Sequence, residues 1–247
     1  MLYFTHNLPL TLLVMGLVTL AVTLLFDWPR VKALTGFRLH FSPRESKPLL
    51  AEVWPMMVNA ALLTLLAAIP RYFLELFHGS EVLGYFGSVS TPAVIIQAGC
   101  SFIYTPLVAP LTERYLGHRW AALRSMLLRA LIGILGFAVC MFLGAALLGR
   151  WGLTLLFGEA ILPYASLLLP VLGTTLCISL IYLFDVLLTI GRRLKLMTVI
   201  HLCAVAVATA VSLLAIPTMG MEGVLLALYV SAGGDMAAMG VAVMVML

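Results

Sequence analysis

Long apolar stretches dominate this chain and alternate with short polar segments. A helix that crosses a bilayer needs roughly 20 mostly apolar residues. Seven stretches reach that length, at about residues 8–26, 49–77, 82–111, 125–148, 161–190, 194–216 and 223–247. The third stretch contains Pro92 and Pro106, where a missing backbone N–H predicts breaks in the helix. The pattern therefore predicts an all-α fold, a polytopic membrane bundle of about seven transmembrane helices.

The basic residues are concentrated in alternate polar segments. Of the 14 Lys and Arg residues, all but Arg71 and Arg150 fall in three groups, at 30–47, 114–129 and 192–195. Basic loops of inner-membrane proteins stay in the cytoplasm. We therefore expect segments 27–48, 112–124 and 191–195 to be cytoplasmic and the loops near 78–81, 150–160 and 217–222 to be external. This alternation places the N-terminus outside and the C-terminus in the cytoplasm.

Composition supports a membrane protein and excludes several other classes. The chain is 63% hydrophobic and 10% charged, with a mean hydropathy of +1.14. A soluble domain is nearer half apolar and a quarter charged, so lipid must be much of this protein's solvent. The net charge of +4 is spread over the loops. It indicates contact with anionic lipid headgroups rather than with nucleic acid.

The same pattern divides the chain into three parts. We expect a lone transmembrane helix at 1–26, a basic cytoplasmic linker at 27–48 and a six-helix bundle at 49–247. The last residues, 242–247, are apolar and carry no polar tail. This favours a fragment, or the product of a truncated reading frame.

No pattern typical of an enzyme is present in the sequence. It contains no serine-nucleophile motif, no glycine-rich phosphate loop and no zinc-binding spacing. The four cysteines lie in apolar runs without Cys or His partners at metal-ligand spacing. We therefore predict no catalytic residues, no metal and no cofactor. The informative residues are polar ones at membrane depth, because a charge there must face a cavity, the protein interior or a partner.

Arg71 is the first candidate for a binding residue. It follows Pro70, which frees a backbone carbonyl in the helix, and it precedes Glu75 by one helical turn. In one interpretation, Arg71 lines a cavity and binds an anionic group such as a phosphate. In the other, Arg71 and Glu75 form an interfacial ion pair that anchors the helix end.

Three polar residues are further candidates for a substrate-binding wall. Asn59 lies twelve residues before Arg71, about 3.3 turns away, and either faces the same cavity or makes an interhelical hydrogen bond. Gln97 lies between the two prolines of the third stretch, and Tyr104 follows on about the same helical face. Such groups often line sugar-binding sites, but polar side chains also occur where membrane helices simply pack against each other.

Two aspartates are candidates for ion coupling. Asp185 either binds a proton or cation or pairs with Arg192 or Arg193 at the cytoplasmic interface. Asp235 lies near mid-membrane, where an unpaired carboxyl group is either protonated or faces a partner that is missing from this chain. His201, in the sixth stretch, is either a hydrogen-bonded packing residue or a proton switch.

Several short motifs resemble one family in order and spacing. Residues 69–75 (IPRYFLE) and 81–86 (EVLGYF) resemble the start of the second lobe of the polysaccharide flippases in the multidrug/oligosaccharidyl-lipid/polysaccharide exporter superfamily. Residues 155–159 (LLFGE), 191–195 (GRRLK) and 219–224 (MGMEGV) are similar to that family's later loops. The resemblance covers about residues 45–247 and identifies them as a C-terminal lobe.

This resemblance implies a function. The family has two six-helix lobes around a central cavity, and it moves lipid-linked oligosaccharide across the bacterial inner membrane by alternating access, often coupled to ion gradients. Arg71 matches the cationic residue expected to meet the lipid pyrophosphate or acidic sugars. The first five helices of the family are absent from this sequence. A facing N-terminal lobe, on the same or a separate chain, is therefore an expected partner, together with membrane lipids.

Three alternatives remain open. A drug/cation antiporter of the same superfamily would use deep acidic residues, for which Asp185 and Asp235 are available. A membrane-embedded polymerase or ligase of the same pathway would need a large external loop with catalytic Arg and His residues, and the external loops are short. A non-transporting membrane subunit is the third alternative.

Overall fold

The computed structural model describes residues 8–30 and 43–247. Every regular element within these residues is helical, and seven of the helices are long and apolar enough to cross a membrane. The prediction of an all-α, multi-pass membrane protein is confirmed at this level. The chain divides into two compact units, residues 1–51 and 52–247.

The first unit contains one apolar helical segment. It comprises α2 (Leu8–Val22) and a π-helical segment η1 (Thr23–Asp27). Its described apolar side chains other than Val14 are exposed, Leu13 and Leu25 among them. Residues 31–42, most of the expected basic linker, lie outside the described part of the chain.

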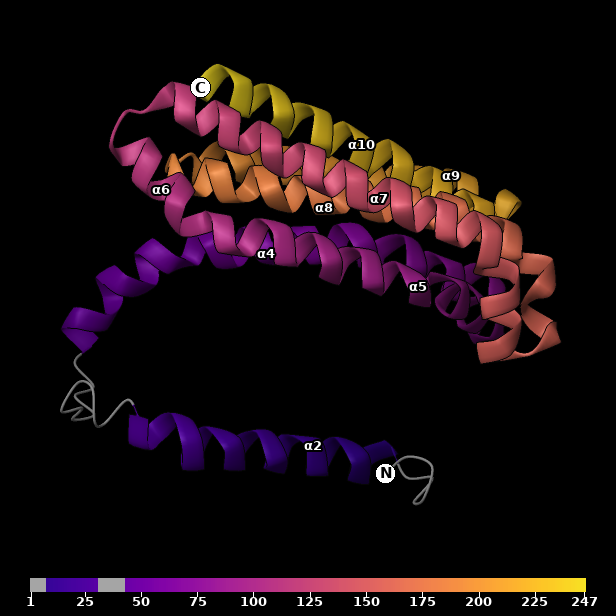
Figure 1. Ribbon diagram of the computed structural model, residues 1–247. Helices are drawn as coiled ribbons and strands as arrows, with labels where there is room; N and C mark the ends of the chain where they lie inside the picture. Colours follow the sequence, from indigo (N-terminus) through magenta and orange to yellow (C-terminus); the bar gives the residue numbers. More distant parts are fainter. Residues whose placement is uncertain (1–7, 31–42) are drawn as a thin grey trace. The chain divides into compact units, whose positions relative to one another are not determined.

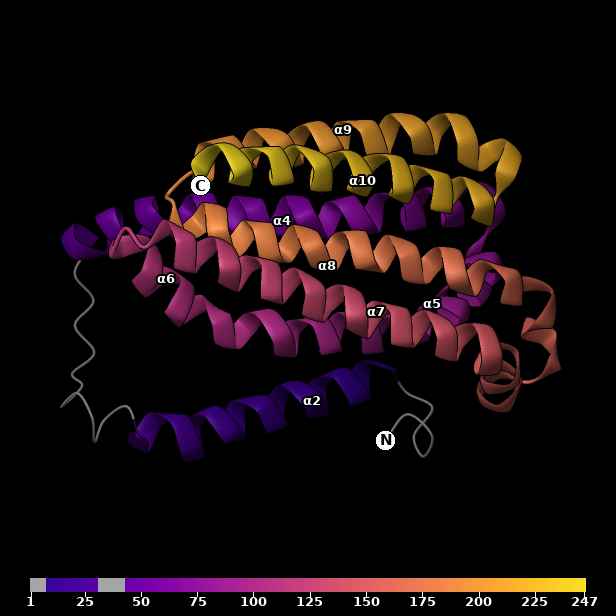
Figure 2. The same cartoon turned by 45° about the horizontal axis from the view of Figure 1, so that its top comes forward.

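The second unit is a bundle of long helices that run side by side (Figures 1 and 2). Helix α8 contacts α5, α7, α9 and α10, and α10 also packs along α9. Its elements are α4 (Pro43–His78, which begins in the first unit), α5 (Ser80–Tyr104), η2 (Thr105–Leu107), α6 (Val108–Leu116), α7 (Trp120–Phe157), η3 (Glu159–Leu167), α8 (Leu168–Ile190), α9 (Leu194–Met219) and α10 (Met221–Met246).

At one end of the bundle, each connection consists of a single glycine. Gly79, Gly158 and Gly220 have φ angles of 86°, 78° and 57°, in the left-handed region that glycine enters without steric cost. Each backbone N–H bonds the carbonyl four residues earlier, so the glycine ends one helix and the next begins immediately. We call this the glycine end.

At the opposite end, two three-residue turns repeat one geometry (Figure 1). His118 and Arg192 have φ angles of 52° and 53°. In each turn, this residue's N–H bonds the carbonyl three residues back, and the next N–H bonds the carbonyl five back. That is the Schellman arrangement, here with a non-glycine residue in the left-handed position. We call this end, which carries Arg119, Arg192 and Arg193, the basic end.

The structure corrects two expectations about the helices. Helix α5 continues through Pro92, so the expected break there is wrong, whereas Pro106 lies in the 3-10 turn that separates α5 from α6. The expected loop at 150–160 is also largely wrong, because α7 continues to Phe157 and only Gly158 separates it from η3. Proline is tolerated inside membrane helices because neighbouring groups compensate for the lost hydrogen bond.

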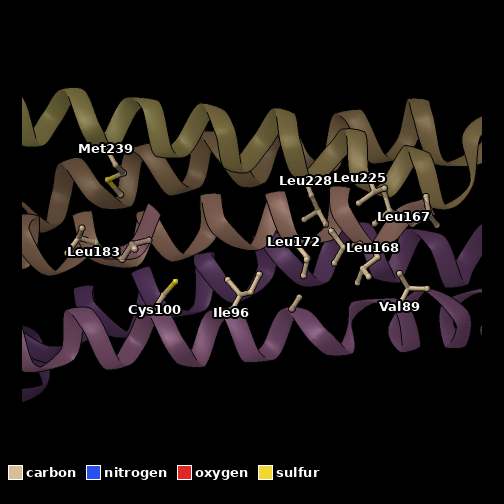
Figure 3. Packing of buried hydrophobic residues seen from close by; sticks show 14 of the residues in the cluster. Val89, Ile96, Cys100, Leu167, Leu168, Leu172, Leu183, Leu225, Leu228 and Met239 are labelled. Carbon is tan, nitrogen blue, oxygen red and sulfur yellow. The ribbon is translucent and has the colours of Figure 1, made fainter. Parts of the chain in front are cut away.

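The core follows the long axis of the bundle. Buried side chains from α5, α8 and α10, including Ile96, Leu172 and Leu228, form one continuous cluster (Figure 3). A second cluster joins Leu63 and Leu66 of α4 to small and branched residues of α8, α9 and α10. Many large apolar side chains are instead exposed on the outside of the bundle. Lipid accommodates such a surface.

Candidate functional site

An open cavity of about 550 Å³ lies between α4, α5 and α8. Arg71 and Gln97, two of the expected binding residues, both line it. The other polar groups on its wall are Thr64, Tyr72, Glu75, Ser90, Thr175 and Tyr182. The remaining wall is apolar, formed by alanine, leucine, valine and isoleucine side chains. A mostly apolar pocket with a few converging polar groups is typical of a ligand site.

Arg71 brings a cation to this cavity. It is exposed and, within the described part of the chain, makes no hydrogen bond or ion pair. The expected alternative pair with Glu75 is not formed, although Glu75 lines the same cavity. Arg71 lies eight residues before Gly79 on α4, about 12 Å from the glycine end. Its guanidinium therefore has all of its donors available to a bound group.

The hydroxyl groups on the wall are arranged as acceptors. Thr64, Ser90 and Thr175 each donate their hydrogen to a backbone carbonyl four residues earlier, at 2.7–3.0 Å. Their lone pairs remain available, because each hydroxyl has two. Gln97 makes no hydrogen bond with other described residues, so its amide can both donate and accept. The cavity can thus bind a polyhydroxylated ligand as well as an anion.

Asn59 and Tyr104 do not line the cavity. The Asn59 amide donates to Thr198 Oγ1 at 3.0 Å and to the Pro55 carbonyl at 2.7 Å, which joins α4 to α9. This is the interhelical alternative that the sequence left open. The Tyr104 ring stacks on Tyr182, with centroids 6.3 Å apart and planes at 16°. Tyr104 therefore packs against Tyr182, which lines the cavity, and does not line the cavity itself.

A second polar site is buried between α8, α9 and α10. His201 Nδ1 lies 2.9 Å from Asp235 Oδ2, and His201 Nε2 lies 3.2 Å from Asp185 Oδ1. The exposed fractions of the side chains are 1% for His201, 0% for Asp235 and 17% for Asp185. We call these three residues the Asp–His–Asp cluster. Its two contacts are the only ion pairs among the described residues.

The cluster brings together both residues expected to couple ions. Asp185 pairs with His201 and makes no ion pair with Arg192 or Arg193, the alternative that the sequence suggested. Asp235, which needed a partner at membrane depth, finds it in the same imidazole. The sequence singled out all three residues as polar groups within apolar helices. It did not show that they meet, because they lie 16 and 34 residues apart on three helices.

The cluster and the cavity share one face of α8. Thr175, Ile178 and Tyr182 line the cavity, and Asp185 follows three residues later. Spacings of three and four residues keep side chains on one side of a helix. Asp185 therefore continues the cavity-lining stripe by one turn toward the basic end, where its side chain meets His201.

The described residues include no group of three or more His, Cys, Asp and Glu side chains that could hold a metal ion. Comparison of the chain with protein-family models, with curated proteins and with solved structures finds no match.

Proposed function

We propose that this chain is part of a membrane transporter that moves lipid-linked oligosaccharide or polysaccharide precursors across the bacterial inner membrane by alternating access. The observation that carries the proposal is Arg71, a cation that has no ion-pair partner among the described residues and lies on the wall of an open cavity between apolar helices long enough to cross a membrane. A lone cation at membrane depth is costly unless a cavity or a ligand compensates it. The motif resemblance adds the substrate class.

The binding mode follows from the wall. Arg71 binds a phosphate or acidic sugar through charge-assisted hydrogen bonds. Gln97, Tyr182 and the hydroxyl acceptors of α4 and α8 bind sugar hydroxyl groups, and the alanines between them leave room for a sugar ring. The chain performs no chemical step on the substrate in this proposal. Movement of the lobe against a facing lobe, on the same or another chain, exposes the cavity alternately to the two sides.

A cationic substrate is the second candidate, and Glu75 favours it. Its carboxylate lies on the same cavity wall as Arg71 and has no ion-pair partner among the described residues. A drug/cation antiporter would bind its substrate at this carboxylate. The two candidates predict opposite effects of removing one charge from the cavity, so a single experiment separates them.

The experiment measures binding of a farnesyl-diphosphate-linked oligosaccharide to the full chain in lipid nanodiscs. Arg71→Gln is expected to weaken binding at least about tenfold, because a hydrogen bond to a charged group contributes about 1.5–3 kcal/mol. Glu75→Gln is expected to preserve or strengthen it. A cationic dye serves as the second probe, and for an antiporter Glu75→Gln would abolish its binding.

Arg150→Gln is the matched control. Arg150 is also exposed and lies eight residues before its turn glycine, Gly158, as Arg71 lies before Gly79. It lies outside the proposed cavity. The anionic probe is expected to bind this variant as it binds the unmodified chain. Equal binding by the unmodified chain and Arg71→Gln would overturn the assignment.

A further inference from the structure

The Asp–His–Asp cluster is built differently from the cavity and has no place in the proposed binding of substrate. Both imidazole nitrogens of His201 face carboxyl oxygens, at 2.9 and 3.2 Å. A neutral imidazole offers one donor and one acceptor, and an imidazolium offers two donors. The number of protons in the cluster can therefore be counted from its hydrogen bonds.

Two exchangeable protons are the minimum that satisfies both contacts. With one proton, a neutral imidazole would turn a bare nitrogen toward a carboxylate, and two acceptors would face each other. With two protons, an imidazolium lies between two carboxylates, or a neutral imidazole lies between one carboxylate and one carboxylic acid. Either arrangement has a net charge of −1.

A third proton brings the cluster to neutrality. A net charge is unfavourable in a low-dielectric interior, so the two-proton state attracts one more cation. The charged and titratable groups that meet here are His201 from α9, Asp185 from α8 with Tyr182 one turn before it, and Asp235 from α10. Helix α4 approaches through Asn59, which is uncharged, on Thr198.

Asp185 is the point of entry. Its side chain is 17% exposed, whereas those of His201 and Asp235 are 1% and 0% exposed. It also lies on the same face of α8 as the cavity residues Thr175 and Tyr182. The second oxygen of Asp235, Oδ1, is buried and has no hydrogen-bond partner among the described residues. The outer oxygen of Asp185 is therefore the most accessible acceptor of the cluster.

We propose that Asp185, His201 and Asp235 form a proton-binding site that takes up one proton at Asp185 and passes between net charges of −1 and 0. Water supplies the proton, and the carboxylate of Asp185 becomes a carboxylic acid while both contacts of His201 are kept. Binding of the proton needs no substrate. Its role as the coupling ion of transport rests on the function proposed above.

A proton fits this site better than a metal cation. Hard cations need several oxygen ligands at once. Here the imidazole ring separates the two carboxyl groups, and each inner oxygen is already hydrogen-bonded to a ring nitrogen. One carboxylate oxygen at the edge of the cluster is enough for a proton.

The test is infrared difference spectroscopy of the full chain in lipid nanodiscs, between about pH 8 and about pH 5, a range that covers histidine and many carboxyl titrations. Sodium is replaced by choline. The chain has only three aspartates, Asp27, Asp185 and Asp235. Labelling with ¹³C-carboxyl aspartate therefore identifies an aspartic acid band without any mutation. A band that appears on acidification and shifts with the label is expected.

Variants then assign the band. Asp185→Asn is expected to abolish it, whereas Asp27→Asn, which changes an exposed carboxyl group in the first unit, is expected to leave it unchanged. The proposal is overturned if no labelled band appears in the unmodified chain. It is also overturned if the band persists in Asp185→Asn, or if added sodium removes it at constant pH. The labelled, unmodified chain decides the first outcome even if Asp185→Asn does not fold.

The two proposals fail separately. The infrared band needs neither substrate nor a facing lobe, and binding of the diphosphate probe needs no protonation of Asp185. A band without probe binding would leave the proton site in place and remove the proposed substrate. Probe binding without an infrared band would support the proposed substrate and remove the proposed proton site.

Discussion

The cavity and the Asp–His–Asp cluster share helix α8, yet they treat charge in opposite ways. In the cavity, Arg71 and Glu75 are exposed and form no ion pair with described residues. In the cluster, His201 lies within hydrogen-bond distance of both aspartates, and His201 and Asp235 are almost fully buried. Free charges beside open volume are suited to a large ligand, whereas paired charges without open volume are suited to a proton.

The difference shows what a polar residue at membrane depth indicates. The general rule is that such a residue faces a cavity or a partner, and the rule holds for both sites. Which of the two applies depends on neighbours from other helices. Burial and pairing, rather than residue type, therefore separate the proposed ligand site from the proposed proton site in this molecule.

Removal of the imidazole shared by the two aspartates is expected to cause the largest difference in stability between a variant of the cluster and a variant of the cavity. His201→Leu leaves two carboxylates without their common partner in the interior, which is expected to lower the free energy of unfolding by about 3–5 kcal/mol. Arg71→Leu, at the exposed site, is expected to change it by less than about 0.5 kcal/mol. Equilibrium unfolding in mixed detergent micelles measures both. Similar losses in the two variants would erase the distinction between the sites.

A change in the packing of α9 against α10 is expected to have the next largest effect. A Cβ at Gly223 would lie 2.8 Å from backbone atoms of Ala215 and Ile216, so the two helices must shift. Gly223→Ala is expected to lower the free energy of unfolding by about 1–3 kcal/mol. Gly234→Ala on the same helix meets nothing within 4 Å and is expected to raise it by up to about 1 kcal/mol. The same unfolding measurement applies, and equal effects would contradict the expected close approach.

Asn59 tests where the boundary between the two sites lies on α4. Asn59→Ala removes the hydrogen bond to Thr198 and is expected to lower the free energy of unfolding by about 1–2 kcal/mol. Binding of the diphosphate probe is expected to stay within about twofold, since Asn59 does not line the cavity. A large loss of probe binding with unchanged stability would instead mean that Asn59 contributes to the substrate-binding site.

Accessibility to aqueous reagents distinguishes the two sites with the least disturbance. The test uses a chain in which the four native cysteines are replaced and one new cysteine is introduced, at Gln97 on the cavity wall or at Ser231 near the cluster. A thiol reacts as the thiolate and only where the reagent can reach it. Gln97→Cys is therefore expected to react with a membrane-impermeant thiol reagent at least about tenfold faster than Ser231→Cys. Ser231 is 1% exposed and lies one turn before Asp235 on α10. Equal rates would mean that the cluster is as open as the cavity.

The general fold could be predicted from the sequence. Seven long apolar stretches predict seven helices, and those helices are found. The residues at which the helices end could be predicted less well from the sequence. Helix α7 runs on through residues 150–157, which contain Arg150 and Gly152, because helix caps and tertiary contacts decide where a helix ends. The passage of α5 through Pro92 depends likewise on neighbours that a single segment does not reveal.

The sites were partly predictable. For Arg71 and Gln97 the sequence leaves open a cavity-lining role or a packing role, and both residues line the cavity, whereas Asp185 and Asp235 stand out in the sequence as unusual residues at membrane depth. That His201 joins the two aspartates could not be foreseen, because the contact depends on the relative rotation and register of α8, α9 and α10. For Asn59 the sequence leaves open the same cavity as Arg71 or an interhelical hydrogen bond, and the structure shows the hydrogen bond to Thr198.

The single-residue turns at the glycine end leave the helices they join almost no slack. Gly79 and Gly220 each connect two long helices without a loop, and Gly158 connects α7 directly to the 3-10 segment η3. If one helix tilts or rotates, the next must follow, or the hydrogen bonds that end the first helix must break. Residues 52–247 are therefore expected to move as one rigid unit in any conformational change, including the proposed alternating access. Insertion of an epitope at any of these glycines would require part of an adjoining helix to unwind.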